Sequence, residues 1–229
     1  MSSQLFRISG LGLLVGAIAF IVYIVTRSDI TAGPDPATFY KEDLWVPINA
    51  LGATGAMLVL MGLPAICARM AGLTGLTGLL GLVGVVLIAI AWMFFGVFLS
   101  LYGVLVAPWL ADQAPSLVAG SAPLPAGFII AFSAGLVSQS VGTVLLAIPF
   151  IRRRVEPSWV GYMLPVSAFV AVVGDLIASH GPAANLAVNL VSNLGPALLL
   201  VALGYIGLQM LSEHAPAMQT ESRVHPSLR

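Results

Sequence analysis

Charged residues and cysteine are scarce in this sequence. Asp, Glu, Lys and Arg together make up 8% of its 229 residues, and their formal charges sum to zero. Lys41 is the only lysine, so the basic surface that follows a nucleic-acid backbone is missing, and we exclude nucleic acid as a partner. Cys67 is the only cysteine, which excludes an intrachain disulfide and any cysteine-based zinc or iron–sulfur site.

Apolar residues, in contrast, make up 59% of the chain. A water-soluble protein of this length needs more polar surface, so this chain needs a lipid bilayer around it. About 20 apolar residues in a helix cross the hydrocarbon core, and backbone groups inside lipid must bond internally. We therefore predict an all-α, polytopic transmembrane helical bundle with six spans, at residues 8–26, 46–68, 79–107, 127–150, 158–179 and 184–211.

The basic residues predict how these spans are oriented, because they are kept preferentially on the cytoplasmic side of a membrane. Arg27 and Lys41 lie on one side of the predicted bundle. Seven arginines lie on the other side: Arg7, Arg69, Arg152, Arg153, Arg154, Arg223 and Arg229. We therefore expect both termini in the cytoplasm, a disordered polar tail at 212–229, and a location in the cytoplasmic membrane.

The predicted connections differ in length on the two sides. The cytoplasmic connections at 69–78 and 151–157 are short, which indicates that the spans they join pack as antiparallel hairpins. The outer connections at 27–45 and 108–126 are long for a helical bundle, and we expect them to cover the outer face. We expect Trp45 at the level of the lipid headgroups, where an amphipathic indole is favourable.

The sequence contains no motif for a cofactor or a metal ion. Glycine recurs at every third position from Gly72 to Gly84, but a phosphate-binding loop needs a preceding strand or a GxxxxGK[ST] pattern. Close helix packing is the better interpretation. The aromatic residues at 92–98 occupy every face of their helix, which indicates contacts with lipid and neighbouring helices. The three histidines, His180, His214 and His225, are not placed for haem ligation within the bilayer.

Polar side chains inside the predicted spans are the candidates for function, because such groups are costly in lipid and usually face the bundle interior or a wet cavity. Most of them fall between the middle of the membrane and its outer face. They define a candidate polar cavity: Asn49, Ser138, Gln139, Ser140, Asp175, His180, Asn185, Asn189, Ser192 and Asn193.

Asn185, Asn189 and Asn193 are four residues apart and therefore share one face of the sixth span. Pro196 follows, and a proline deprives the carbonyl four residues earlier, that of Ser192, of its helical donor and promotes a kink. Two interpretations stay open. Transporters use free carbonyls of broken membrane helices to hold ions or substrates, whereas asparagines also join neighbouring helices by hydrogen bonds.

Asp175 is the only acidic residue well inside a predicted span. It has two interpretations as well. An intramembrane carboxylate can bind a cation or relay a proton, here together with His180. A carboxylate one turn from the outer end of a helix can also face the headgroups or cap a neighbouring helix.

One stretch carries a resemblance to other proteins. The segment LWVPINALGATGAMLVLMGLPAICARMAGLTGLTGLLG resembles a group of small six-span bacterial membrane proteins of unknown function. The resemblance is carried by Trp45-Val46-Pro47, Leu63-Pro64 and the turn Ala68-Arg69…Ala71-Gly72. It implies a bacterial cytoplasmic membrane and supplies no catalytic residues.

The leading functional hypothesis is a small channel, carrier or receptor for a small solute or a cation. Its outward-facing cavity would be built from the second, fourth, fifth and sixth spans. The alternative is an accessory or structural subunit whose polar residues only join helices and whose glycine faces dock a partner subunit or a second copy. A membrane enzyme ranks third, because acid, base and metal-binding groups do not converge.

Overall fold

Helices account for all regular structure in the part of the chain that the computed structural model describes, namely residues 3–31, 36–118, 126–152, 155, 158–180 and 186–212. Within these residues, six helical stretches are long and apolar enough to cross a membrane: Gln4–Ile30, Trp45–Ala71, Leu76–Gln113, Ala126–Arg152, Ser158–Ile177 and Leu186–Ser212. The predicted fold class is confirmed, and the chain is an integral membrane protein with multiple spans.

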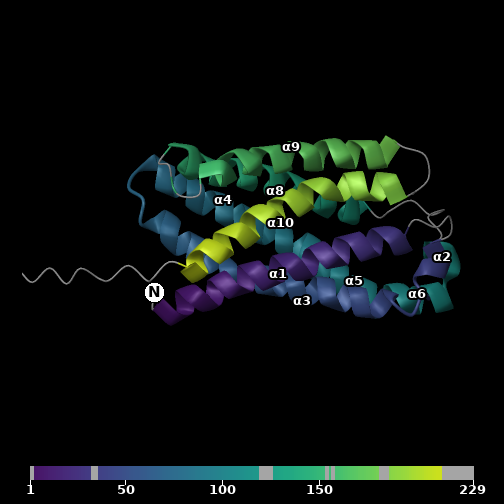
Figure 1. Ribbon diagram of the computed structural model, residues 1–229. Helices are drawn as coiled ribbons and strands as arrows, with labels where there is room; N and C mark the ends of the chain where they lie inside the picture. Colours follow the sequence, from purple (N-terminus) through teal and green to yellow (C-terminus); the bar gives the residue numbers. More distant parts are fainter. Residues whose placement is uncertain are drawn as a thin grey trace, which may run out of the picture.

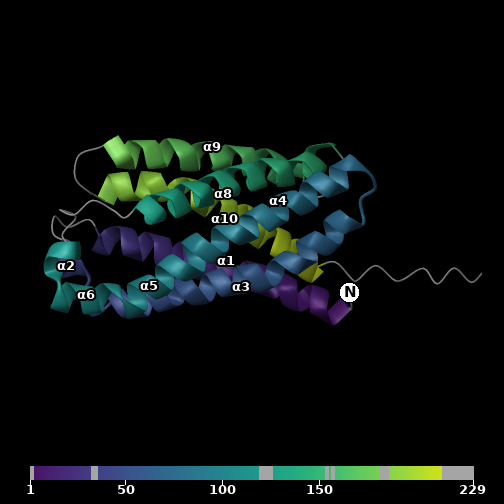
Figure 2. The same cartoon turned by 180° about the vertical axis from the view of Figure 1, so that it is seen from behind.

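The long helices run alternately up and down along the bundle (Figures 1 and 2). They are α1 (Ser3–Ile30), α3 (Trp45–Ala71), α4 (Leu76–Trp92), α8 (Ala126–Arg152), α9 (Ser158–His180) and α10 (Leu186–Ser212). Each one packs on the next, and α10 packs back on α1. The helices therefore form a closed ring, in which α1 begins and α10 ends at the same end of the bundle (Figure 1).

Glycine allows the closest approaches between helices. A Cβ atom added to Gly16 of α1 would lie 2.7 Å from the carbonyl oxygen of Gly55 in α3. A Cβ atom added to Gly142 of α8 would lie 2.8 Å from the carbonyl oxygen of Gly84 in α4. Carbon atoms normally approach other heavy atoms to about 3.5–4 Å, so these crossings need glycine. At Gly75, which precedes α4 with a φ of 77°, the backbone conformation itself favours glycine.

Apolar side chains fill the centre of the ring in the half of the bundle that holds the beginning of α1. Each of the six long helices contributes a fully buried side chain to this core: Leu13, Ile66, Ile88, Phe150, Leu164 and Leu203. In the opposite half, the buried residues include polar and aromatic ones, such as Trp45, Asn49 and Ser100, and a cavity lies among the helices. The core therefore closes the bundle at one end and leaves space toward the other.

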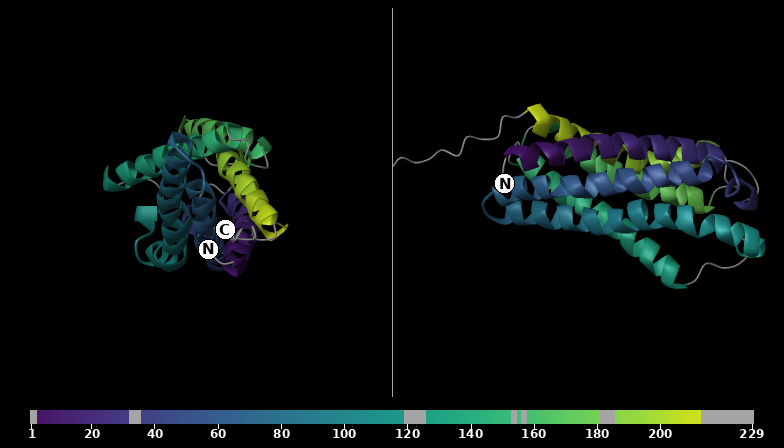
Figure 3. Two further views of the ribbon diagram at one scale, coloured as in Figure 1. Left: turned by 90° about the vertical axis from the view of Figure 1, so that its left-hand side faces the viewer. Right: turned by 90° about the horizontal axis from the view of Figure 1, so that it is seen from below.

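The third long stretch changes its geometry midway. α4 continues directly into η1 (Met93–Phe98), a segment of π-helix, and then into α5 (Leu99–Leu105). A π-helix has a wider turn than an α-helix and is frequently found at functional sites. Figure 3 shows that the first turns of α8 diverge from the rest of the bundle. There Phe132 of α8 contacts Phe95 of η1, with 5.1 Å between the ring centroids.

Short helices lie at the end of the bundle opposite to the beginning of α1 (Figure 1). They are α2 (Pro36–Phe39), α6 (Ala107–Gln113) and α7 (Pro115–Val118), so part of the connection expected at 108–126 is helical. Trp45 begins the second span, as expected, but protein rather than lipid surrounds it, because it is 1% exposed; its place at the level of the headgroups stays a prediction. Its Nε1 donates a hydrogen bond of 2.8 Å to the carbonyl oxygen of Gly103 in α5, so a protein carbonyl satisfies the indole.

Candidate functional site

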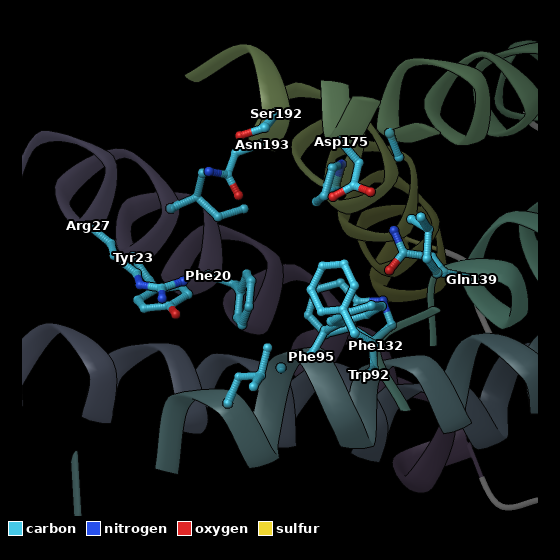
Figure 4. Close-up of a pocket in the computed structure, with 16 residues that line it drawn as sticks. Phe20, Tyr23, Arg27, Trp92, Phe95, Phe132, Gln139, Asp175, Ser192 and Asn193 are labelled. Atoms are coloured by element: carbon cyan, nitrogen blue, oxygen red, sulfur yellow. The ribbon is translucent and has the colours of Figure 1, made fainter. Parts of the chain in front are cut away.

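The interior space in the half of the bundle beyond the apolar core includes a main cavity of about 240 Å³. Residues of α1, the α4–η1–α5 stretch, α8, α9 and α10 line it. Four of the lining residues also belong to the apolar core, so the cavity adjoins that core: Phe20, Tyr23, Ile24 and Trp92. Figure 4 shows a polar side and an aromatic side facing each other across this space.

The polar side of the main cavity consists of amide and carboxylate groups. Gln139 of α8, Asp175 of α9 and Asn193 of α10 direct their side chains toward the space (Figure 4). Asp175 is partly buried, and no salt bridge to it occurs in the described part of the chain. Ser192 and Pro196 also line the cavity, and since Pro196 has no N–H, the Ser192 carbonyl lacks its helical donor.

The aromatic side of the main cavity is built from three different helical stretches. Phe20 of α1 contacts both Tyr23 and Trp92, with 4.8 Å between ring centroids in each pair. Phe95 of η1 and Phe132 of α8 complete this side. Trp92 is 3% exposed, and its Nε1 donates to no acceptor in the described part of the protein. A buried N–H without an acceptor costs about 1–3 kcal/mol.

A second cavity, of about 210 Å³, lies beside the main one and shares Tyr23, Ile24, Arg27 and Asn193 with it. Its remaining lining residues stand nearer to the ends of their helices, so this cavity lies between the main cavity and the bundle end that carries α2. We call it the vestibule. Its walls include the hydroxyl groups of Ser28, Thr31 and Tyr40.

Arg27 lies where the two cavities meet. Its guanidinium carbon is 5.7 Å from the ring centroid of Tyr23 and 5.8 Å from that of Trp45, within the range of a cation–π interaction. Its Nε is buried and has no hydrogen-bond acceptor in the described residues. Tyr40 stands close by, and burial raises the pKa of its hydroxyl, an effect that the positive charge of Arg27 partly opposes.

Hydrogen bonds between α10 and α1 form one wall of the vestibule. Asn189 Nδ2 donates to the Ser28 carbonyl oxygen at 3.2 Å and to Thr31 Oγ1 at 3.1 Å. Asn193 Nδ2 donates to Ser28 Oγ at 3.3 Å and to the Asn189 carbonyl oxygen at 2.8 Å. These two asparagines therefore join helices, and they line the cavities as well. The interpretation of Asn189 and Asn193 as residues that join helices is thus seen in these hydrogen bonds, and the interpretation that the stripe holds an ion or substrate stays a prediction.

The structure brings part of the predicted polar set together. Gln139, Asp175, Ser192 and Asn193 line the main cavity, and Asn189 lines the vestibule. Three predicted residues line neither cavity: Asn49, Ser138 and Ser140. The remaining two, Asn185 and the side chain of His180, lie outside the described residues.

Asn49 of α3 takes part in a contact between helices instead. It is 1% exposed, and its Nδ2 donates to the Trp45 carbonyl oxygen at 2.8 Å. A Cβ atom added to Gly103 would lie 2.5 Å from its Oδ1, so its amide packs against the backbone of α5. The second span thus gives the main cavity no lining residue, although the sequence had suggested that it would.

Sequence reasoning missed the contributions of α1 and of the α4–η1–α5 stretch. Arg27 was expected in an outer connection but lies in the last turn of α1. Trp92 and Phe95 were assigned to lipid and neighbour contacts but line the main cavity. The only indication available in the sequence was the position of these residues near the outer half of their spans, and it does not reveal which face of a helix points inward.

Among the described residues, His, Cys, Asp and Glu form no group of three or more that could hold a metal ion. The chemistry visible at the site is therefore that of one carboxylate, one guanidinium, three amide or hydroxyl side chains and a set of aromatic rings. Comparisons with models of protein families, with curated proteins and with solved structures gave no match to this chain.

Proposed function

We propose that the protein is a carrier or receptor that binds the ammonium group of a small organic molecule in the main cavity. The observation that carries this proposal is the position of Asp175, which shares the main cavity with Phe20, Trp92, Phe95 and Phe132. A carboxylate inside a membrane is costly and usually has a functional partner. Aromatic rings across from a carboxylate supply the faces that attract an ammonium group.

The size and composition of the main cavity agree with a small ligand. Ligand cavities are usually about 300–1,000 Å³, mostly apolar, with a few placed polar groups. The main cavity of about 240 Å³ lies just below this range, which favours a molecule of the size of choline over a larger solute. Gln139 and Asn193 add amide groups that accept or donate hydrogen bonds.

We propose further that the cavity opens toward the outside of the cell membrane. Arg7, Arg69 and Arg152 all lie near helix ends at the end of the bundle where the apolar core closes the ring. The positive-inside rule assigns that end to the cytoplasm. The vestibule, which is nearer to the opposite end, then gives access from outside. The bacterial origin implied by the resemblance remains part of this proposal.

Choline and its uncharged carbon isostere, 3,3-dimethyl-1-butanol, test the proposal directly. We expect choline to raise the unfolding temperature of the purified protein in detergent and to do so in a saturable manner, because it binds only the folded state. The isostere has the same shape without the positive charge, and we expect it to have a much smaller effect.

The substitution Asp175→Asn should lower the affinity for choline at least about tenfold, because it removes the charge that the ammonium group meets in a poorly solvated site. Asp43→Asn is the matched control, since Asp43 is exposed and lines neither cavity. If choline fails to stabilise the wild-type protein, or stabilises both variants equally, the proposal is wrong. The polar residues would then only join helices, as the accessory-subunit hypothesis expects.

A further inference from the structure

The main cavity contains a positive charge as well as a negative one. Asp175 and Arg27 are its charged lining residues in the described part of the chain, and no salt bridge joins them. In Figure 4, Phe20 and Asn193 lie between Arg27 and Asp175. A ligand in the cavity therefore meets opposite charges at its two ends.

We infer that the ligand is a small zwitterion whose ammonium group lies beside Asp175 and whose anionic group is bound by Arg27. This inference rests on the proposed function and specifies its substrate class. A simple cation would compensate Asp175 but would be repelled by Arg27. A neutral solute would compensate neither charge. A molecule with separated, opposite charges matches both without adding net charge to a membrane interior, where uncompensated charge is costly.

Arg27 has unused capacity to bind an anion. A guanidinium carries five N–H donors in a fixed plane and pairs well with carboxylate or phosphate oxygens. The buried Nε of Arg27 has no acceptor among the described residues. The guanidinium carbon lies over the rings of Tyr23 and Trp45, and none of the described carboxylates forms a salt bridge with Arg27.

The vestibule adds a neutral donor beside Arg27. The Tyr40 hydroxyl lines it and remains a donor at neutral pH. Asn189 lies on the same wall, but its two N–H groups are already donated to Ser28 and Thr31, so its role there is to fix the wall. The vestibule thus supplies the Tyr40 hydroxyl and one positive charge, whereas the main cavity supplies the carboxylate and the aromatic rings. The anionic end of the ligand would point to the vestibule.

A series of trimethylammonium carboxylates tests this inference against choline. The probes are glycine betaine and its homologues with two to five methylene groups between the charges, each competing with radiolabelled choline for the purified protein. We expect at least one homologue to bind the wild-type protein about tenfold or more tightly than choline, the gain that a charge-assisted hydrogen bond provides. The spacing that binds best reports the separation between the two charged groups.

The substitution Arg27→Gln should act on the two ligand types in opposite directions. We expect it to abolish the preference for the best betaine and to raise the affinity for choline, because a repelling charge is removed. Arg27→Lys should keep part of the preference for the betaine. Lys41→Gln is the matched control, since Lys41 is exposed and lines neither cavity, and it should change neither affinity.

The outcomes separate the two proposals. If choline binds in an Asp175-dependent manner but no betaine binds better, the inference about Arg27 is wrong and the proposed function stands. The same holds if Arg27→Gln weakens choline and betaines equally, which would indicate a purely structural role for Arg27. If neither choline nor any betaine binds the wild-type protein, both proposals are refuted.

Discussion

The crossing of α4 and α8 just beneath the main cavity should be sensitive to a single methyl group. In the variant Gly142→Ala, the new Cβ would lie 2.8 Å from the Gly84 carbonyl oxygen and 3.0 Å from the Ile88 backbone nitrogen. These are backbone atoms, so the strain is relieved only if the helices separate. Overpacking of this kind typically costs about 1–3 kcal/mol, and alanine recovers about 1 kcal/mol through its higher helix propensity. We expect a net loss of about 1 kcal/mol.

Gly127→Ala in the same helix is the matched control. A Cβ atom at Gly127 meets no other atom within 4 Å, so this variant keeps the gain in helix propensity, at most about 1 kcal/mol, without the packing cost. The difference between the two variants therefore isolates the packing cost, about 1–3 kcal/mol. Unfolding by sodium dodecyl sulfate in mixed micelles, followed by tryptophan fluorescence, measures the free energy of unfolding. If Gly142→Ala is as stable as Gly127→Ala, the close crossing is refuted.

Two further predictions concern the outer half of the bundle. Trp45→Phe should lower the free energy of unfolding by about 1–2 kcal/mol in the same assay, because the Gly103 carbonyl loses its buried donor; an unchanged value would contradict this hydrogen bond. An ultraviolet titration should show Tyr40, identified by its loss in Tyr40→Phe, ionising above the ordinary pKa of 10.0, and Arg27→Gln should raise that pKa further. Because the pKa of Tyr40 is raised in the folded protein, folding favours the neutral phenol. The contribution of Tyr40 to the free energy of unfolding is therefore fully present below pH about 10 and is lost as the pH rises through its pKa in the folded protein.

The six spans could be predicted from the sequence because each is a long apolar run, and lipid leaves a polypeptide few alternatives to a helix. The sequence does not predict which helices are neighbours in the ring. That depends on which glycine faces contact each other, and nothing in the sequence distinguishes Gly16 and Gly142 from the many other small residues. The same limit explains why the α1–α10 contact, which closes the ring, was not anticipated.

The candidate site was predictable where polarity alone identified it. Asp175 and Asn193 stand out because such groups are rare within apolar helices. Trp92 and Phe95 do not stand out, since aromatic residues face lipid as readily as a cavity. The π-helix also shifts which residues face inward after position 93, and no periodic pattern in the sequence indicates it. Arg27 was missed because the end of α1 extends beyond its apolar run.

The closure of the ring by α1 and α10 has a consequence for biosynthesis. α1 is synthesised before α10, yet its Ser28 accepts hydrogen bonds from Asn189 and Asn193, which are 161 and 165 residues later in the chain. At a synthesis rate of about 5–20 residues per second, α10 follows on the order of 10–30 s later. During that interval the nascent chain holds an open, incomplete ring with exposed polar groups. The ring can therefore be completed only after α10 has been synthesised, and the quality-control machinery of the cell has that interval in which to recognise incomplete bundles.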